Sequence, residues 1–167
     1  MNLTKLNNLQ KTVLVIAGSD PSGGAGIQAD LKTLTSFGVY GMTAITALTE
    51  QNSNGVFDIL EIPIDFVVKQ INCCLSDINA NAVKIGMLHS ADLISAVLEA
   101  LFNNNIVSNK KVNVVLDPVM VAKGGHKLLK ENAIDALKNF IKVAQPILTP
   151  NIPEAEILTG IKINNLE

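Results

Sequence analysis

Residues 13–30 read VLVIAGSDPSGGAGIQAD and join an apolar strand to a helix through a glycine-rich turn. The first four residues are all apolar and predict a buried strand, and a helical pattern begins after Gly26. Gly23, Gly24 and Gly26 allow the backbone of the turn to approach a ligand with no Cβ in the way. The unpaired N–H groups at the start of a helix favour anions or polar ligand groups. We therefore expect a small-molecule site at this turn.

The glycine turn matches neither of two familiar nucleotide-binding patterns. No Gly-Lys-Ser/Thr follows it, which excludes a Walker loop, and the G-x-G-x-x-G spacing of a dinucleotide fingerprint is absent. By itself such a turn indicates either close packing or ligand binding. Asp30, on the first turns of the helix, also has two interpretations: it complements the helix dipole, or it contacts the ligand.

The composition indicates one globular domain that binds neither nucleic acid nor membranes. The chain has 167 residues, of which 48% are hydrophobic and 17% charged, and its formal net charge is −2. It has no basic stripe, and no apolar run is long enough to span a bilayer. Residues 1–12 are rich in Asn and Leu without an apolar core. We therefore expect them to form an N-terminal extension rather than a secretory signal.

The two cysteines, Cys73 and Cys74, are neighbours within an amphipathic helical pattern. Adjacent cysteines rarely form a disulfide, and the chain has no Cys/His cluster with zinc spacing. We expect at least one of them to face the core in a structural role. A reducing, cytoplasmic setting fits this use of cysteine.

Apolar strands alternate with amphipathic helical patterns along the chain. Strands are predicted at Val13–Ala17, Val39–Leu48, Val56–Ile62, Ala82–Met87, Val112–Leu116 and Pro146–Leu148. Helices are predicted at Gly26–Phe37, Asp65–Ile78, Ala91–Phe102, Lys130–Ile141 and Pro153–Leu158. This alternation predicts an α/β fold with a mostly parallel, doubly wound sheet that helices cover on both faces.

Polar residues follow most of these strands, at the sheet edge where doubly wound folds bind ligands. They include Asp20, Glu50–Asn52, His89, Asp117 and Asn151. Asp117 directly follows an apolar strand and precedes a proline. Its carboxylate either takes part in a magnesium–phosphate centre or caps a turn.

Five motifs in register resemble the hydroxymethylpyrimidine/phosphomethylpyrimidine kinases of thiamine biosynthesis, a family of the ribokinase-like superfamily. The motifs are AGSDPSGGAGIQADLKT at 17–33, GVYGMTAITALTEQN at 38–52, VKIGML at 83–88, VVLDPVMVAKGG at 114–125 and LTPNIPEA at 148–155. The resemblance implies a three-layer αβα fold, of which residues 13–167 form the N-terminal portion with the C-terminal part missing.

The resemblance also implies an activity. Kinases of this family use ATP and Mg²⁺ to phosphorylate 4-amino-5-hydroxymethyl-2-methylpyrimidine and then its monophosphate. A homodimer is implied as well, with a contact at the exposed strand Val56–Ile62.

By resemblance, the pyrimidine-binding residues are Gln51, Asp30, Gly18, Met87 and Val119. Gln51 and Asp30 would hold the aminopyrimidine edge near the Gly18 backbone, and the other two would contact the ring. An aminopyrimidine presents a donor beside an acceptor, and the carboxamide of Gln51 offers the complementary pair. The alternative for Gln51 is a loop residue that caps the turn at 52–55.

Asn151 and Glu154 match the N-x-x-E element that the resemblance links to magnesium and phosphate through water. They also suit a helix start, with Asn151 as the cap, and both roles are compatible. Lys123, beside two glycines, either contacts phosphate or is only solvated. His89 and His126 are expected to be surface or strand-end residues rather than catalytic bases.

The family's Gly-Thr-Gly-Cys-like segment, which forms an anion hole and carries the catalytic residue, does not occur in this sequence. No catalytic residue is therefore predicted here. One alternative is a truncated, non-catalytic product that binds aminopyrimidine. Another is a pyridoxal or pyridoxine kinase, because that family shares the fold, but the motifs around Gln28–Asp30 and Glu50–Asn52 favour the pyrimidine.

Overall fold

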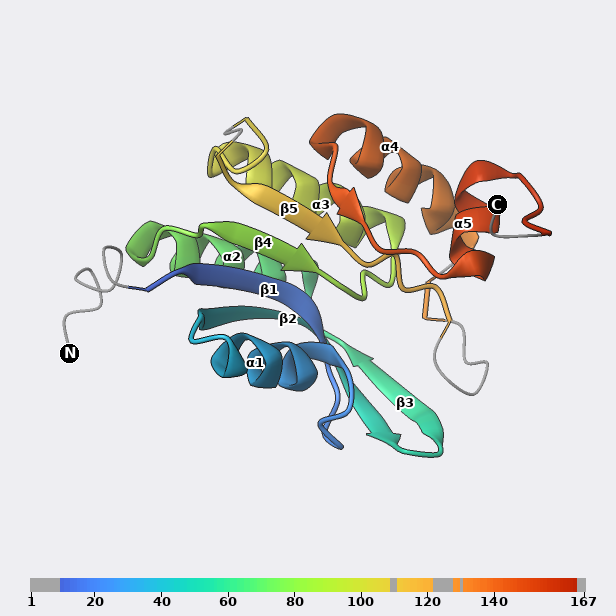
Figure 1. The fold of residues 1–167 in the computed structure, drawn as a ribbon, viewed down its shortest axis with the longest axis horizontal. Helices are drawn as coiled ribbons and strands as arrows, with labels where there is room; N and C mark the ends of the chain where they lie inside the picture. The colour runs from blue at the N-terminus through green and yellow to red at the C-terminus, as the bar shows by residue number, and fades with distance from the viewer. Residues whose placement is uncertain (1–9, 109–110, 122–127, 130, 165–167) are drawn as a thin grey trace.

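A computed structural model describes residues 10–108, 111–121, 128–129 and 131–164, and they form three layers around one sheet (Figure 1). The strands are β1 (Thr12–Ser19), β2 (Tyr40–Asn52), β3 (Gly55–Glu61), β4 (Ala82–Ile85), β5 (Asn113–Leu116) and β6 (Ile147–Leu148). The helices are α1 (Gly26–Ser36), α2 (Ile64–Asp77), α3 (Ala91–Asn103), α4 (Ile134–Ala144) and α5 (Ile152–Thr159).

The sheet is parallel except at one edge. Its strand order is β3-β2-β1-β4-β5-β6, and only β3 runs antiparallel to its neighbour within the described residues. The central strand β1 is apolar because both of its faces are covered, and its residues 14–17 are at most 1% exposed. The predicted mostly parallel, doubly wound α/β sheet is confirmed.

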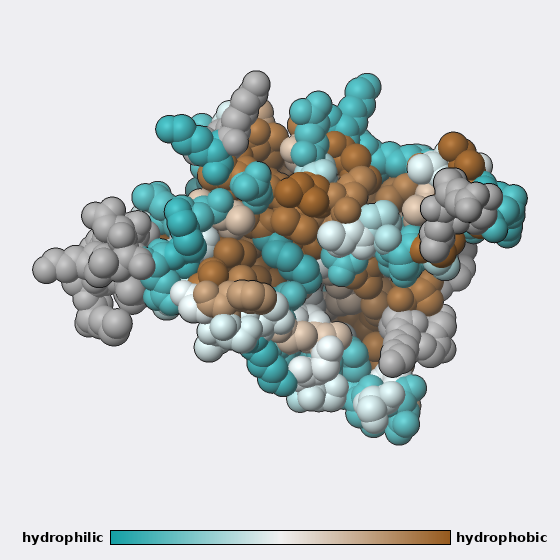
Figure 2. Space-filling model, in the orientation of Figure 1, coloured by the Kyte–Doolittle hydropathy of each residue, from teal (hydrophilic) through white to brown (hydrophobic). Residues whose placement is uncertain are grey.

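The two faces of the sheet have different coverings. Leu14 and Ile16 point into the main core, which α2, α3 and α4 complete, whereas Val15 and Ala17 pack against Ile27 of α1. In the described part of the chain, α1 alone lies on its face, over β1 and β2 (Figure 1). Apolar side chains farther along the sheet remain visible at the surface, and Ile147 of β6 is 56% exposed (Figure 2).

β2 is longer than predicted and leaves the sheet as a ribbon. A register shift interrupts its pairing with β1 between Ile45 and Leu48. The side-chain amide of Gln70 in α2 accepts from the Ile45 N–H and donates to the Ile45 carbonyl, at 3.0 and 3.1 Å. β2 then continues with β3 as an antiparallel ribbon beyond the end of β1 (Figure 1). This ribbon forms one wall of the candidate site.

Two details of the local structure differ from the sequence analysis: the alternative position of Gln51 in a loop, and the bounds of one helix. Gln51 is not in a loop, because it pairs with Val56 in the β2–β3 ladder. In place of the single helix predicted at Lys130–Ile141, a 3₁₀ turn at Glu131–Ala133 precedes α4. α4 ends at Ala144, and the cap residue Gln145 has a left-handed conformation. Lys130 itself, and most of the predicted extension at residues 1–12, lie outside the described residues.

The cysteine prediction is confirmed. Cys73 is exposed and Cys74 packs partly buried against the main core, and both are free thiols. Burial raises the pKa of the Cys74 thiol, with a further contribution from neighbouring Cys73. Across the residues that the structure describes, no helix is long and apolar enough to cross a membrane.

The contact between Gln70 and the irregular point of β2 is open to test. Gln70→Met keeps the side-chain length but removes both hydrogen bonds, so two backbone groups lose their partners. We expect the free energy of unfolding to fall by about 2 kcal/mol in urea denaturation. Lys69→Met is the control, because its ion pair with Asp65 is exposed to solvent and such pairs contribute little to stability. Equal effects of the two substitutions would contradict this role.

Candidate functional site

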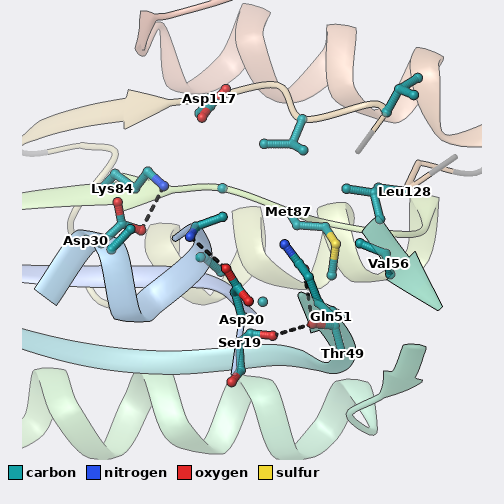
Figure 3. A pocket seen from close by; sticks show the side chains of 18 residues that line it. Ser19, Asp20, Asp30, Thr49, Gln51, Val56, Lys84, Met87, Asp117 and Leu128 are labelled. Atoms are coloured by element: carbon teal, nitrogen blue, oxygen red, sulfur yellow. Dashed lines mark hydrogen bonds and ion pairs between the residues drawn. The ribbon is translucent and has the colours of Figure 1, made fainter. Parts of the chain in front are cut away.

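A pocket of about 370 Å³ lies at the carboxyl ends of β1, β2, β4 and β5, beside α1 (Figure 3). That size suits a small-molecule ligand. Six of the residues predicted to bind substrate, phosphate or metal line it together: Gly18, Asp30, Gln51, Met87, Asp117 and Val119. The predicted gathering of strand-end residues at one sheet edge is therefore present in the structure.

The carboxylate of Asp20 holds the glycine turn from inside. Oδ1 accepts hydrogen bonds from the N–H and the hydroxyl of Ser22, at 2.9 and 2.8 Å. Oδ2 accepts from the N–H groups of Gly24 and Ala25, at 3.0 and 2.8 Å. Burial alone would raise the pKa of Asp20, but the hydrogen bonds from these three residues outweigh it and lower the pKa. Three backbone donors of the turn are thus already used and cannot bind a phosphate.

Gln28 fastens the first turn of α1 to the end of β1. Its Oε1 accepts from the Asp20 N–H at 2.8 Å, and its Nε2 donates to the Ser19 hydroxyl at 2.7 Å. Gly26 has φ +54°, and a Cβ there would lie 2.4 Å from the Gly18 carbonyl oxygen. Only glycine allows this close approach, so the turn brings the β1 backbone to the pocket wall.

One end of the pocket is apolar and carries a single amide. Met87 and Leu128 are 7% and 9% exposed and form a small cluster with Ala47, against which Val119 packs. Oε1 of Gln51 lies 3.1 Å from the Thr49 hydroxyl, and Figure 3 shows its side chain beside Met87. This end matches a flat ring with hydrogen-bonding groups on one edge.

The other end of the pocket is charged. Lys84 Nζ lies 2.8 Å from Asp30 Oδ2, and the two side chains are 26% and 22% exposed. Figure 3 shows this pair with Asp117 at the opposite end from Gln51. Burial raises the pKa of Asp117; the positive charge of Lys84 opposes this shift, whereas the carboxylates of Glu154 and Asp30 add to it.

Asp30 therefore lies in different surroundings from those expected. Its partner is a lysine on β4 rather than the N-terminal turn of α1, so the helix-dipole interpretation is not supported. A contact with the same aminopyrimidine edge as Gln51 stays a prediction, and the separation of the two residues favours another role for Asp30. The sequence analysis missed Lys84, although a lone lysine within the apolar strand at 82–85 signals a charge that needs a partner.

Asn151 and Glu154 form the cap of α5. The Asn151 side chain accepts from the Glu154 N–H at 2.9 Å, and Glu154 Oε2 accepts from the Asn151 N–H at 3.0 Å. Glu154 is 6% exposed, and its Oε1 lies 3.4 Å from the Met120 N–H. The predicted capping role is confirmed, and a role in metal or phosphate binding stays a prediction.

None of the remaining candidates is among the described residues that line the pocket. Lys123 and His126 lie outside the described residues. His89 was predicted at the surface or a strand end, but it is 4% exposed, with Nδ1 3.3 Å from Glu61 Oε1 of β3. Glu61 is distant from His89 in the sequence, so the local sequence does not reveal this contact. In the ranges that the structure describes, no group of three or more His, Cys, Asp or Glu side chains is placed to hold a metal ion.

Comparisons with known proteins agree on one family. A family model for phosphomethylpyrimidine kinase matches residues 20–167. The hydroxymethylpyrimidine/phosphomethylpyrimidine kinase of Haemophilus influenzae is 49% identical over 153 residues, covering 92% of this chain and 55% of that protein. The enzyme of the same name from Bacillus subtilis is 43% identical over 158 residues, again covering 92% and 55%. The chain thus spans about half the length of these curated relatives.

Solved structures show the same likeness. A crystal structure of phosphomethylpyrimidine kinase from Clostridium difficile has a TM-score of 0.83 and 47% identity, covering 94% of this chain and 66% of that one. Pyridoxal kinase from Staphylococcus aureus in complex with pyridoxal has a TM-score of 0.79 and 36% identity, covering 94% and 56%. The expected ribokinase-like fold is confirmed.

Removing the charge of Asp20 tests the structure of the turn. Because the folded state lowers the pKa of this carboxyl, its stabilisation is fully present above the ordinary value of 3.8 and is lost as the pH falls through the lower pKa. We expect Asp20→Asn to lower the free energy of unfolding by about 2 kcal/mol at pH 7. The deficit should shrink below about pH 4. Chemical denaturation across this pH range measures both effects.

Asp77→Asn, at an exposed position at the end of α2, is the matched control and should leave the pH dependence unchanged. A deficit for Asp20→Asn that stays constant from pH 7 to about pH 2 would show that the carboxylate charge does not hold the turn.

Proposed function

The chain belongs to the phosphomethylpyrimidine kinase family, and we propose that it forms the pyrimidine-binding part of an ATP-dependent kinase. Its substrates would be 4-amino-5-hydroxymethyl-2-methylpyrimidine and the monophosphate of that compound. The observation that carries the proposal is the pocket with an amide and apolar wall at one end and charged side chains at the other. A substituted aminopyrimidine matches both ends: its flat ring suits the end with the amide and apolar side chains, and its polar substituent suits the charged end.

Gln51 would recognise the amino group and the adjacent ring nitrogen. The Thr49 hydroxyl lies within hydrogen-bond distance of Gln51 Oε1 and restricts the rotation of the amide. The amide then offers a donor and an acceptor in one plane, which is the complement of the aminopyrimidine edge. Met87 and Val119 would contact the ring. The side chain of Met87 packs closely against Gly18, which keeps the pocket narrow.

The charged end would handle the phosphates of ATP and the divalent cation that such kinases use. Asp117 fits a Mg²⁺ ligand, because its partly buried carboxylate has a raised pKa and gains from a nearby cation. Both oxygens of Glu154 already accept backbone hydrogen bonds, so Glu154 would reach the ion through water. Bound Mg²⁺ supplies charge neutralisation to the transferring phosphoryl group. Asn151 and Lys123 remain predicted phosphate contacts.

Binding of aminopyrimidine without phosphoryl transfer is the alternative for this chain. The residues proposed to contact the ring all lie between positions 18 and 119, so binding and transfer are separable properties. A pyridoxal kinase is the second alternative, supported by the 36% identity to the Staphylococcus aureus enzyme. Pyridoxal lacks the aminopyrimidine edge, so the ligand preference distinguishes the two substrates.

Replacing Gln51 tests the proposed substrate. We expect Gln51→Ala to weaken binding of the hydroxymethyl aminopyrimidine about 10- to 100-fold, the loss of two hydrogen bonds. Calorimetric titration of the 167-residue chain measures the affinity. Glu50→Ala is the control, because Glu50 is exposed on the neighbouring position of the same strand. An unchanged affinity in Gln51→Ala, or tighter binding of pyridoxal by the wild-type chain, would overturn the pyrimidine assignment.

We further propose that two copies associate through β3, in the reducing setting that the free cysteines fit. Leu48 and Leu60 are paired across the ribbon and are 41% and 65% exposed, and Phe57 is 58% exposed. A second copy that covers this surface would explain why these apolar side chains are exposed in a single chain.

Leu60→Asn should weaken self-association at least about tenfold in sedimentation experiments. Phe102→Asn, with 57% exposure on α3, should not, and a wild-type chain that stays monomeric would refute the contact.

A further inference from the structure

Lys84 carries the only positive charge among the described residues that line the pocket. It lies at the third position of β4, between Val83 and Ile85, which are fully buried in the main core. Because side chains alternate along a strand, Lys84 points to the other face of the sheet, where α1 and the pocket lie. β4 therefore places one ammonium group, that of Lys84, at the charged end of the site.

The ammonium of Lys84 is held by Asp30 and lies beside Gly86. Asp30 of α1 accepts one of its hydrogen bonds at 2.8 Å. A Cβ on Gly86 would lie 3.1 Å from Nζ, so the absence of a side chain at Gly86 makes room for the ammonium. With one of three donors directed to Asp30, the group retains donors for a ligand in the pocket.

The other charged side chains that line the pocket are carboxylates, and they differ in whether they can interact with a ligand. The Asp20 carboxylate accepts four hydrogen bonds within the glycine turn and is already satisfied. Asp30 and Asp117 lie at the charged end with Lys84 (Figure 3). An anionic ligand that enters this end therefore meets repulsion from two carboxylates and attraction from one ammonium.

The substrates in the family's name differ by one phosphate group. A hydroxymethylpyrimidine is neutral at its substituent, whereas the phosphate of a phosphomethylpyrimidine carries between one and two negative charges near neutral pH. Binding of the first does not require a cation, but binding of the second in the presence of two carboxylates does.

We propose that Lys84, positioned by Asp30, is the residue that enables the pocket to bind the phosphorylated substrate, by donating hydrogen bonds from its ammonium to the phosphate. This inference rests on the proposed function and assigns separate roles to two residues of the pocket. Gln51 selects the pyrimidine, and Lys84 distinguishes the phosphorylated from the unphosphorylated form.

The experiment compares two ligands on the 167-residue chain: the hydroxymethyl aminopyrimidine and its monophosphate. Calorimetric titrations are carried out in EDTA, so that no divalent cation links the phosphate to Asp117. Lys84→Met removes the charge and keeps the length of the side chain. We expect it to weaken binding of the monophosphate at least about tenfold and to change binding of the hydroxymethyl compound less than about twofold. Added salt should weaken only the monophosphate in the wild-type chain.

Two further variants complete the design. Lys69→Met removes an equivalent charge from an exposed position on α2 and should affect neither ligand. Lys84→Gln keeps a hydrogen-bond donor to Asp30, so it shows whether the missing charge or a disturbed Asp30 causes the loss. Retained binding of the hydroxymethyl compound demonstrates that each variant is folded.

Three results would overturn the inference. Equal losses for both ligands in Lys84→Met and Lys84→Gln would make Lys84 a general support of the pocket. Unchanged binding of the monophosphate would show that its phosphate lies elsewhere, and in both cases the proposed function would stand. If the wild-type chain bound neither compound, the proposed function and this inference would fail together.

Discussion

The hydrogen bonds of the Asp20 carboxylate are the constraint on which the site depends. They close the connection between β1 and α1 within six residues and fix where the helix begins. A charged acceptor inside a glycine turn is stabilised by several N–H groups at once, and this stabilisation is reflected in the lowered pKa. From that fixed start, α1 carries Asp30 to Lys84 one helical turn later. Without this anchor the only helix described on that face of the sheet would have no defined position over the pocket.

The same hydrogen bonds decide which ligand the turn can accept. A glycine-rich turn before a helix resembles a phosphate-binding loop, because unpaired N–H groups there attract anions. Here the protein's own carboxylate occupies that position, so the turn contributes backbone surface and close packing. The positive charge of the site comes instead from the opposite wall, on β4. The pocket is therefore polarised along its length: the amide and apolar side chains lie at the ribbon, and the charges lie between α1, β4 and β5.

Local sequence patterns were sufficient for the layers of the fold and for the sheet edge at which the site forms. The apolar run at Val13–Ala17 and the helical patterns of α1 and α3 depend on periodicities of two and 3.6, which a sequence reveals directly. The extension of β2 to Asn52 was not predictable in this way, because it depends on pairing with β3 and on Gln70 from α2. The partner of Lys84 lies 54 residues away, so no window of sequence contains the ion pair. The residue type of Lys84, which the sequence analysis passed over, signals that a partner is needed, but only the fold identifies that partner.

The cap of α5 shows how one residue has a structural role and an electrostatic one at the same time. Both oxygens of Glu154 accept backbone hydrogen bonds, and the side chain is buried. Burial raises the pKa of Asp117, and the nearby carboxylates of Glu154 and Asp30 raise it further, which makes a negative charge at Asp117 costly. A cation bound at Asp117 would relieve both repulsions at once. In the proposed site, the helix cap would thus favour a cation without being one of its direct ligands.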